Sequence, residues 1–312
     1  MRYAHSYTSL TPEELQARIT SDGDDQPVII DTLPAERFAK VHIPGALNAC
    51  VFEIRFLEQV HLLCADSNTP LVLYGANSNS LDSRTAAQKL TMAGYANIAI
   101  LDGGLERWKQ CGYALQGADP EMTGAEEHRI ADGEYAIIVD ESLLGWTGRN
   151  SNTSHYGTVD ISGGHLHVEG NSIQGSFLMD MESIANLNLA GSELQQVLVS
   201  HLKSDDFFLA DGFPAARFSI RGGRFTREAD VTRANCEIDG TLELRGIQND
   251  LKFQAIVTRW QDGHLHLSSH FDLDRTLWGI TYGSGSYYQH LGMHSVFDLI
   301  TIDVRIVARL QE

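Results

Sequence analysis

The sequence has 312 residues, of which 43% are hydrophobic and 21% are charged, and its formal net charge at pH 7 is −18. This composition is typical of a globular protein with about two domains and excludes a fibrous or wholly disordered chain. The acidic excess, without any basic stripe, argues against nucleic acid as a partner and against docking onto an anionic membrane surface.

The four cysteines, Cys50, Cys64, Cys111 and Cys236, form no CxxC pair. Their number and spacing fit neither a disulfide framework nor a zinc site made of four thiolates. The beginning of the chain lacks the apolar segment of a secretory signal, and no stretch approaches 18 consecutive apolar residues. We therefore expect a cytoplasmic protein without a transmembrane segment.

The first third of the chain alternates strand and helix signals. A helix is expected after Thr11, because a capping hydroxyl is followed by a proline and two acidic residues. Short apolar runs at residues 28–30, 71–74 and 98–101 predict buried strands, and residues 83–93 have apolar positions at helical spacing. This alternation predicts an α/β domain with a parallel sheet that helices cover on both faces.

The composition changes near residue 118. Residues 117–127 are small, polar and acidic, which is typical of a linker. We therefore expect a first domain at residues 1–118, a linker at 119–130 and a second domain at 131–312.

Strand signals dominate the second domain. Polar and apolar residues alternate between glycines over residues 160–177, and shorter runs of the same kind follow at 218–220, 238–244, 251–257, 265–271 and 299–307. One helix is expected at residues 192–202, with one face formed by Leu194, Val197, Leu198 and Leu202. Many antiparallel strands joined by short turns predict an all-β barrel or sandwich with a single short helix.

Two motifs frame the first domain. Asp31 follows a predicted strand and leads to HIPGA at residues 42–46, and DGGLERW at 102–108 follows the third predicted strand. In this order the motifs resemble those of the rhodanese-like (sulfurtransferase) domain, over about residues 8–118. The resemblance implies a catalytic cysteine on the loop that follows the strand at 71–74.

That loop lacks the nucleophile. Rhodanese chemistry needs a thiolate, which a cup of backbone N–H groups stabilises and which carries sulfane sulfur as a persulfide. The matching position is Gly75, and the loop contains no sulfur atom, since it consists of Gly75, Ala76, Asn77, Ser78, Asn79 and Ser80. We therefore predict a degenerate site without sulfurtransferase turnover, and a docking or regulatory role for the domain.

Two other uses of the first domain stay open. Cys50 or Cys64 would have to replace the nucleophile, although each is expected to be a plain core thiol. The N–H groups of the loop, at the start of a helix, could also hold a small anion, but Asp82 would oppose its charge.

The two motifs also have structural interpretations that need no catalysis. Pro44 and Gly45 can form a tight turn, and the glycines at 103–104 permit a close turn from strand to helix. Asp31 is expected to cap a turn or to form an ion pair, with Arg37 or Arg84 as partner.

The second domain contains long stretches that carry a further resemblance. They include residues 146–149, SHYGTV at 154–159, HLKSDDFF at 201–208, GTLELRGI at 240–247 and residues 274–286. Together they resemble the YceI-like family of lipocalin-like barrels that bind polyisoprenoid lipids, over about residues 130–310. The resemblance implies an antiparallel barrel of eight strands, which is just wide enough to hold one slender ligand.

Candidate ligand-binding residues lie in or beside these segments. They are Trp146, His155, His201, Phe207, Phe208, Trp278, Tyr282 and Tyr288. Ordinary core packing is the alternative for each aromatic residue. Two HxH pairs, at 165–167 and 264–266, place imidazoles on one strand face as a metal site would require. Because each pair follows a glycine turn, we interpret it as an outward polar face and expect neither a metal nor another cofactor.

The leading hypothesis is therefore non-enzymatic binding of an isoprenoid or similar amphiphile, such as a polyprenyl chain or a quinone tail, in the barrel. The inactive rhodanese-like domain would serve docking to a protein partner or regulation. The alternatives are an interaction scaffold without a ligand and a sulfurtransferase-type enzyme that uses a noncanonical cysteine. No feature of the sequence indicates an oligomer.

Overall fold

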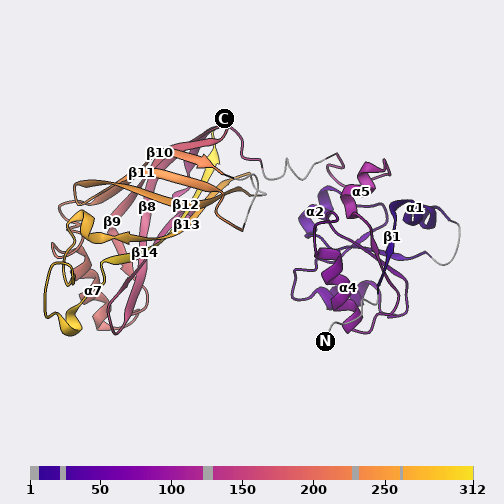
Figure 1. Ribbon diagram of the computed structural model, residues 1–312, viewed down its shortest axis with the longest axis horizontal. Helices are drawn as coiled ribbons and strands as arrows, with labels where there is room; N and C mark the ends of the chain where they lie inside the picture. The colour runs from indigo at the N-terminus through magenta and orange to yellow at the C-terminus, as the bar shows by residue number, and fades with distance from the viewer. Residues whose placement is uncertain (1–6, 22–25, 122–128, 227–231, 261–262, 312) are drawn as a thin grey trace. The chain divides into compact units, whose positions relative to one another are not determined.

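The computed structural model describes residues 7–21, 26–121, 129–226, 232–260 and 263–311 (Figure 1). The chain divides into two compact units, Met1–Thr123 and Gly124–Glu312. Most of the predicted linker, residues 122–128, lies outside the described residues. No helix within the described ranges is both long enough and apolar enough to cross a membrane.

The first unit contains a five-stranded parallel sheet in the order β1-β5-β4-β2-β3. Its strands are β1 (Tyr7–Leu10), β2 (Val28–Asp31), β3 (Leu47–Asn48), β4 (Leu71–Tyr74) and β5 (Ile98–Leu101). Its helices are α1 (Pro12–Thr20), α2 (Ala35–Lys40), α3 (Phe56–Leu63), α4 (Asp82–Met92) and α5 (Gly104–Gln110). The predicted α/β class is confirmed, with the three predicted apolar runs in β2, β4 and β5.

Local chemistry explains these elements. The side chain of Thr11 accepts a hydrogen bond from the N–H of Glu14, and the Glu14 carboxylate accepts one from the N–H of Thr11, so α1 starts at a complete capping box. Alternate residues of β4 enter two cores: Leu71 and Leu73 pack on one side of the sheet, and Val72 and Tyr74 pack on the other. Both faces of the sheet are therefore buried.

The second unit is an antiparallel barrel. Nine strands share eight positions, because β6 and β7 both lie between β8 and β14, and pairing of β13 with β14 closes the sheet on itself. The strands are β6 (Gly133–Ile137), β7 (Leu143–Arg149), β8 (Ser154–Glu169), β9 (Ser172–Asn186), β10 (Ala215–Phe225), β11 (Cys236–Leu244), β12 (Ile247–Arg259), β13 (Leu265–Asp274) and β14 (Leu299–Leu310). The predicted region at 160–177 thus belongs to two strands, β8 and β9.

One helix, α7 (Glu193–Lys203), contacts β9 at one end of the barrel (Figure 1). The short 3-10 helices η2 (Arg275–Trp278) and η3 (Gly292–His294) precede β14, and η1 (Val139–Glu141) joins β6 to β7. The predicted apolar face of α7 packs only in part: Leu202 is buried, whereas Leu194 and Val197 are 62% and 64% exposed. The C-terminal turn of α7 therefore packs against the barrel, while its N-terminal half is more exposed.

Candidate functional site

An apolar cavity of about 120 Å³ lies inside the barrel. Its walls come from inward residues of every barrel strand except β6, because the alternation of strand side chains turns every second residue to the interior. They include Leu144 and Trp146 of β7, Met179 and Met181 of β9, and Ile302 of β14. Apart from Arg275, every side chain that lines this cavity is apolar. Such a wall binds by excluding water from apolar surface.

The cavity lies in the half of the barrel next to α7. Leu202, Phe207 and Phe208, at the end of α7 and just after it, form part of its wall. The other half is filled by buried side chains that do not line the cavity, among them Tyr135, Leu166, Val168, Ile173, Val257 and Leu265. The barrel is therefore hollow only toward its α7 end.

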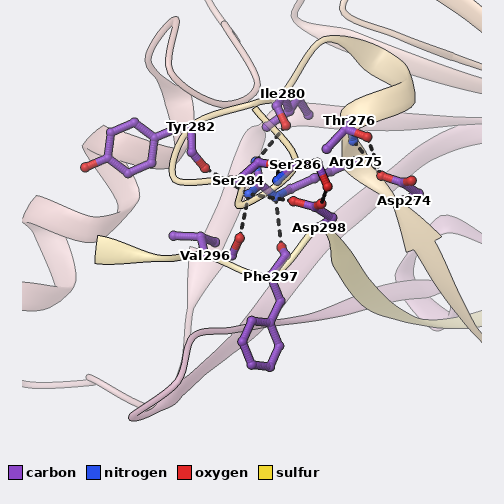
Figure 2. A network of polar contacts seen from close by, with 10 residues as sticks. All are labelled: Asp274, Arg275, Thr276, Ile280, Tyr282, Ser284, Ser286, Val296, Phe297 and Asp298. Carbon is purple, nitrogen blue, oxygen red and sulfur yellow. Dashed lines mark hydrogen bonds and ion pairs between the residues drawn. The ribbon is translucent and has the colours of Figure 1, made fainter. Parts of the chain in front are cut away.

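Arg275 closes part of that end. Its side chain is 1% exposed and donates to four backbone carbonyl oxygens (Figure 2). They belong to Ile280 at 2.6 Å, Tyr282 at 2.8 Å, Val296 at 3.0 Å and Phe297 at 3.0 Å. One guanidinium thus holds both ends of the segment between η2 and β14.

The charge of Arg275 is only partly balanced. The Asp298 carboxylate lies 3.8 Å from the guanidinium, and the guanidinium lies 5.9 Å from the centroid of the Phe207 ring. Burial lowers the pKa of Arg275. Burial also acts to raise the pKa of Asp298, but the hydroxyls of Ser284 and Ser286 and the charge of Arg275 outweigh it and hold this pKa below its ordinary value. Asp298 therefore stays charged near neutral pH.

The structure brings three of the eight sequence candidates together at the cavity wall: Trp146, Phe207 and Phe208. His201 and Tyr282 lie behind that wall, with ring centroids 5.0 Å and 5.3 Å from the centroid of Phe207. They pack against a lining residue and do not line the cavity themselves.

The other three candidates lie elsewhere. Trp278 is buried, and its indole N–H donates to the carbonyl oxygen of Leu242 at 3.0 Å, so it packs in the core. Tyr288 is half exposed. The ring of His155 lies 3.3 Å from the side-chain amide of Asn188, at the surface next to β9.

Sequence reasoning missed Arg275, Gly148 and the two methionines of β9. Arg275 belongs to a segment that carries the family resemblance, but an arginine is seldom fully buried and so gives no cavity signal. Gly148 continues the inward alternation of Leu144 and Trp146, and this alternation is a signal that was available.

The first HxH pair lies on outward positions of β8, and in the second pair His264 directly precedes β13 while His266 belongs to it. Nδ1 of His167 lies 2.8 Å from Oε1 of Glu134, and His266 stacks on Trp260 with ring centroids 4.5 Å apart. Among the residues that the structure describes, no three His, Cys, Asp or Glu side chains are grouped as a metal site would need.

The loop after β4 is the second candidate site. Leu105 and Glu106, at the start of α5, donate their N–H groups to the carbonyl oxygens of Gly75 and Ala76 at 2.9 Å and 3.0 Å. A Cβ atom on Gly104 would lie 2.5 Å from the carbonyl oxygen of Gly75, which explains the glycine of the closing motif at this position. The second motif therefore fixes the loop after β4.

Asp82 occupies the space that a side chain at position 75 would need. A Cβ atom on Gly75 would lie 2.6 Å from both Cγ and Oδ2 of Asp82. Oδ2 accepts the N–H of Ala76 at 3.0 Å, and Oδ1 of Asn77 accepts the N–H groups of Asn79 and Ser80 at 3.0 Å and 3.1 Å. These N–H groups of the cup are therefore bound to side chains of the chain itself.

Asp31, between the two motifs, is fully buried. Its Oδ1 accepts the N–H of Leu33 at 2.8 Å, so the cap predicted from the sequence is present. Burial raises the pKa of Asp31 to about 6, against the opposing effects of Tyr74, the Leu33 N–H and more distant positive charges.

This pKa makes the stability of the first unit depend on pH. The raised value means that the folded unit binds the Asp31 proton more tightly than the unfolded chain, so the stabilisation is present at low pH and is lost as the pH rises through about 6. Asp31→Asn should remove this dependence. The free energy of unfolding of the variant minus that of the wild type should therefore increase by about 2 kcal/mol from pH 4.5 to pH 7.5.

Calorimetry of the full chain at the two pH values measures this difference in the transition of the first unit. Asp102→Asn, at an exposed aspartate, is the matched control and should leave the pH dependence unchanged. An Asp31→Asn protein with the pH dependence of wild type would contradict the assignment.

An antiparallel sheet closed at eight positions, with an apolar interior that is open toward one end, defines a small β-barrel with an internal ligand-sized cavity. The family model of the YceI-like domain matches residues 135–308, more than half of the sequence, and the chain belongs to this family. The model of the rhodanese-like domain matches residues 11–111, so the first unit is a rhodanese-like domain.

Solved structures are similar to each unit. Burkholderia cenocepacia BcnA is 15% identical, with a TM-score of 0.43, over 55% of this chain and 99% of its own. A polyisoprenoid binding domain from Saccharophagus degradans, implicated in plant cell wall breakdown, is 12% identical, with a TM-score of 0.43, over 57% and 98%. The rhodanese-like domain of an Anabaena protein is 22% identical, with a TM-score of 0.31, over 37% and 83%.

Proposed function

We propose that the barrel binds an isoprenoid or similar amphiphilic lipid in its cavity and catalyses no reaction on it. The observation that carries this proposal is the cavity wall, in which Arg275 is the one polar side chain. Burial of an apolar chain against such a wall contributes about 25 cal/mol for each Å² removed from water. Membership of the YceI-like family supports the same class of ligand.

The size of the cavity favours a slender ligand. Its volume of about 120 Å³ is close to the roughly 150 Å³ of an engineered apolar cavity that binds benzene. A longer chain needs the wall to adapt, and Met179 and Met181 are suited to that because their side chains are flexible and polarisable. A single chain fits this space better than a fused ring system.

Titration with all-trans-retinol, a fluorescent isoprenoid alcohol, tests this proposal on the full chain. We expect saturable binding of one retinol per chain, with a rise in retinol fluorescence that farnesol reverses by competition. A protein that takes up neither compound would favour the scaffold hypothesis, in which aromatic side chains fill the barrel.

For the rhodanese-like unit, the proposal is docking or regulation without sulfur transfer. Two features support it. The loop after β4, with Gly75 at the position where the resemblance implies a cysteine, contains no sulfur atom. The Asp82 carboxylate also takes the space next to Gly75 and accepts the N–H of Ala76. A docking role is supported by apolar side chains exposed around α3, namely Phe52, Ile54 and Leu62.

A thiosulfate–cyanide assay should accordingly give no turnover above the uncatalysed rate. Gly75→Cys alone should stay inactive too, because its Cβ would lie 2.6 Å from Cγ of Asp82 and the carboxylate would oppose a thiolate. Activity in the wild-type protein that disappears in Cys50→Ser or Cys64→Ser would contradict this prediction and identify a noncanonical thiol.

A further inference from the structure

Large apolar side chains are exposed mainly at the α7 end of the barrel. They come from α7, from the loops and strand ends beside it, and from the segment Gly279–Asp298, which we call the strap (Figure 1). Among them are Leu194 and Val197 of α7, Leu277 of η2, and Tyr287, Tyr288 and Met293 of the strap. Among the described residues of this unit, four such side chains lie elsewhere, namely Val139, Leu143, Trp260 and Leu310. Exposed apolar surface that gathers in one place marks an interaction site.

The loops at this end form one surface, which we call the rim and which comprises residues 149–154, 187–214, 245–246 and 275–298. Leu194, Val197 and His201 follow one face of α7, because they stand at positions i, i+3 and i+7. The ring of His201 lies against that of Tyr282 in the strap, with centroids 4.7 Å apart. The exposed face of α7 therefore continues onto the strap.

The cavity opens inside the rim. Phe297 of the strap lines the cavity and is also 48% exposed, so its side chain extends from the cavity to the surface. Gly148, near the end of β7, lines the cavity too, and a Cβ on it would meet no atom within 4 Å. The mouth therefore lies between the end of β7 and the strap, where the N–H of Phe297 donates to the Arg149 carbonyl at 2.9 Å.

The rim is nearly neutral, although the chain has a net charge of −18. Four basic and five acidic residues occur in the segments that form it. In the strap, Asp298 is the only Asp, Glu, Lys or Arg, and it lies 3.8 Å from the guanidinium of Arg275. The exposed part of the strap therefore has apolar groups and hydroxyl groups but carries no carboxylate or basic side chain.

A surface of this composition fits the interface of a bilayer with zwitterionic headgroups. Tyrosine rings and aliphatic side chains are the groups that lie at the boundary between headgroups and acyl chains. An anionic bilayer would be repelled by the acidic excess in the rest of the chain. A bilayer is also the phase in which an isoprenoid lipid dissolves, so a mouth against it spares the ligand a passage through water.

We propose that the rim docks on the surface of a zwitterionic membrane and that the barrel exchanges its ligand with the bilayer there. This inference rests on the proposed lipid binding and adds the surface from which the lipid is taken. Docking places Tyr287, Tyr288 and Met293 of the strap among the lipid headgroups, beside the mouth.

Flotation of the full chain with phosphatidylcholine vesicles, without added ligand, tests docking. Val197→Asp with Met293→Asp puts one carboxylate on α7 and one on the strap, at side chains that are 64% and 77% exposed. This double variant should have a partition coefficient at least about tenfold below that of the wild-type protein. Val139→Asp on η1 and Ile54→Asp in the first unit, at exposed apolar positions outside the rim, are matched controls and should float like wild type.

Retinol separates docking from binding. Neither Val197 nor Met293 lines the cavity, so the double variant should bind retinol from solution like the wild-type protein, which also verifies its fold. Its uptake of retinol from phosphatidylcholine vesicles should be at least about fivefold slower, because retinol must then cross water. Adding phosphatidylserine to the vesicles should not strengthen docking of the wild-type protein.

A wild-type protein that binds retinol from solution but does not float would overturn docking and leave lipid binding intact. Flotation that survives in the double variant, or that is lost in Ile54→Asp, would overturn docking as well, as would stronger docking on phosphatidylserine. A protein that floats but binds no retinol would instead overturn the proposed function. In native mass spectrometry, a wild-type dimer that the double substitution makes monomeric would assign the rim to a second copy of the chain and overturn docking.

Discussion

Replacing Arg275 by methionine is expected to lower the free energy of unfolding of the barrel by about 3–5 kcal/mol. The guanidinium is buried and donates to the carbonyls of Ile280, Tyr282, Val296 and Phe297. Methionine fills a similar space but donates nothing, so the buried carbonyls lose their partners and Asp298 loses its counter-charge at 3.8 Å. The loss should be large because one side chain holds both ends of the strap.

Urea unfolding of the barrel, with calorimetry of the full chain to separate the two units, measures this effect. Arg217→Met, at an exposed arginine of β10, is the matched control and should change the free energy of unfolding by less than about 0.5 kcal/mol. A loss of less than about 1 kcal/mol in Arg275→Met would mean that the strap is held mainly by its own turns.

Gly148→Phe should abolish lipid binding while the barrel stays folded. Gly148 lies inward on β7 at the mouth, and a Cβ there meets no atom within 4 Å, so a phenyl group can enter a cavity of about 120 Å³ without a backbone clash. The new side chain occupies the volume that the ligand chain needs. We expect the dissociation constant for retinol to rise at least about 30-fold.

Gly222→Phe is the control for this variant. Gly222 is an exposed glycine of β10 with equally open space around a Cβ, and it does not line the cavity. It should bind retinol like the wild-type protein. Undiminished binding by a folded Gly148→Phe protein would place the ligand outside the cavity.

The order of strands and helices could largely be predicted from the sequence, because apolar runs and alternation report burial directly. The run at 71–74 is apolar throughout since both faces of β4 are covered. The boundary between β8 and β9 was missed, because Gly163, Gly164, Gly170 and Gly175 all interrupt the alternation and only Gly170 stands at the turn between them. A one-dimensional pattern does not separate a glycine inside a strand from one in a turn.

The cavity could be predicted only in part. Trp146, Phe207 and Phe208 line it, whereas Trp278 is equally aromatic and more deeply buried but donates to Leu242 in the core. Aromatic residues that line the cavity and aromatic residues that pack in the core look alike in the sequence. A large aromatic side chain indicates burial, but it does not indicate whether the side chain faces the cavity. The burial of Arg275 could not be predicted in this way, because it depends on carbonyl groups up to 22 residues away along the chain.

For the loop after β4, the sequence supports a more complete prediction than it does for the cavity. The sequence predicts that Gly75 stands where a nucleophile would be needed, and it predicts that Asp82 opposes an anion through its charge. The structure adds a steric reason and a direct contact: the carboxylate lies where a side chain at position 75 would extend, and it accepts the N–H of Ala76. That contact joins residues six positions apart through a loop conformation that spacing alone does not define.

Mass spectrometry on an organic extract of the purified full chain, beside native mass spectrometry of the intact protein, tests the central claim most directly. We predict one lipid per chain, with a long apolar chain, and we predict that Gly148→Phe prepared in parallel carries none. A wild-type protein that is empty on purification and takes up neither retinol nor farnesol would contradict lipid binding in the barrel.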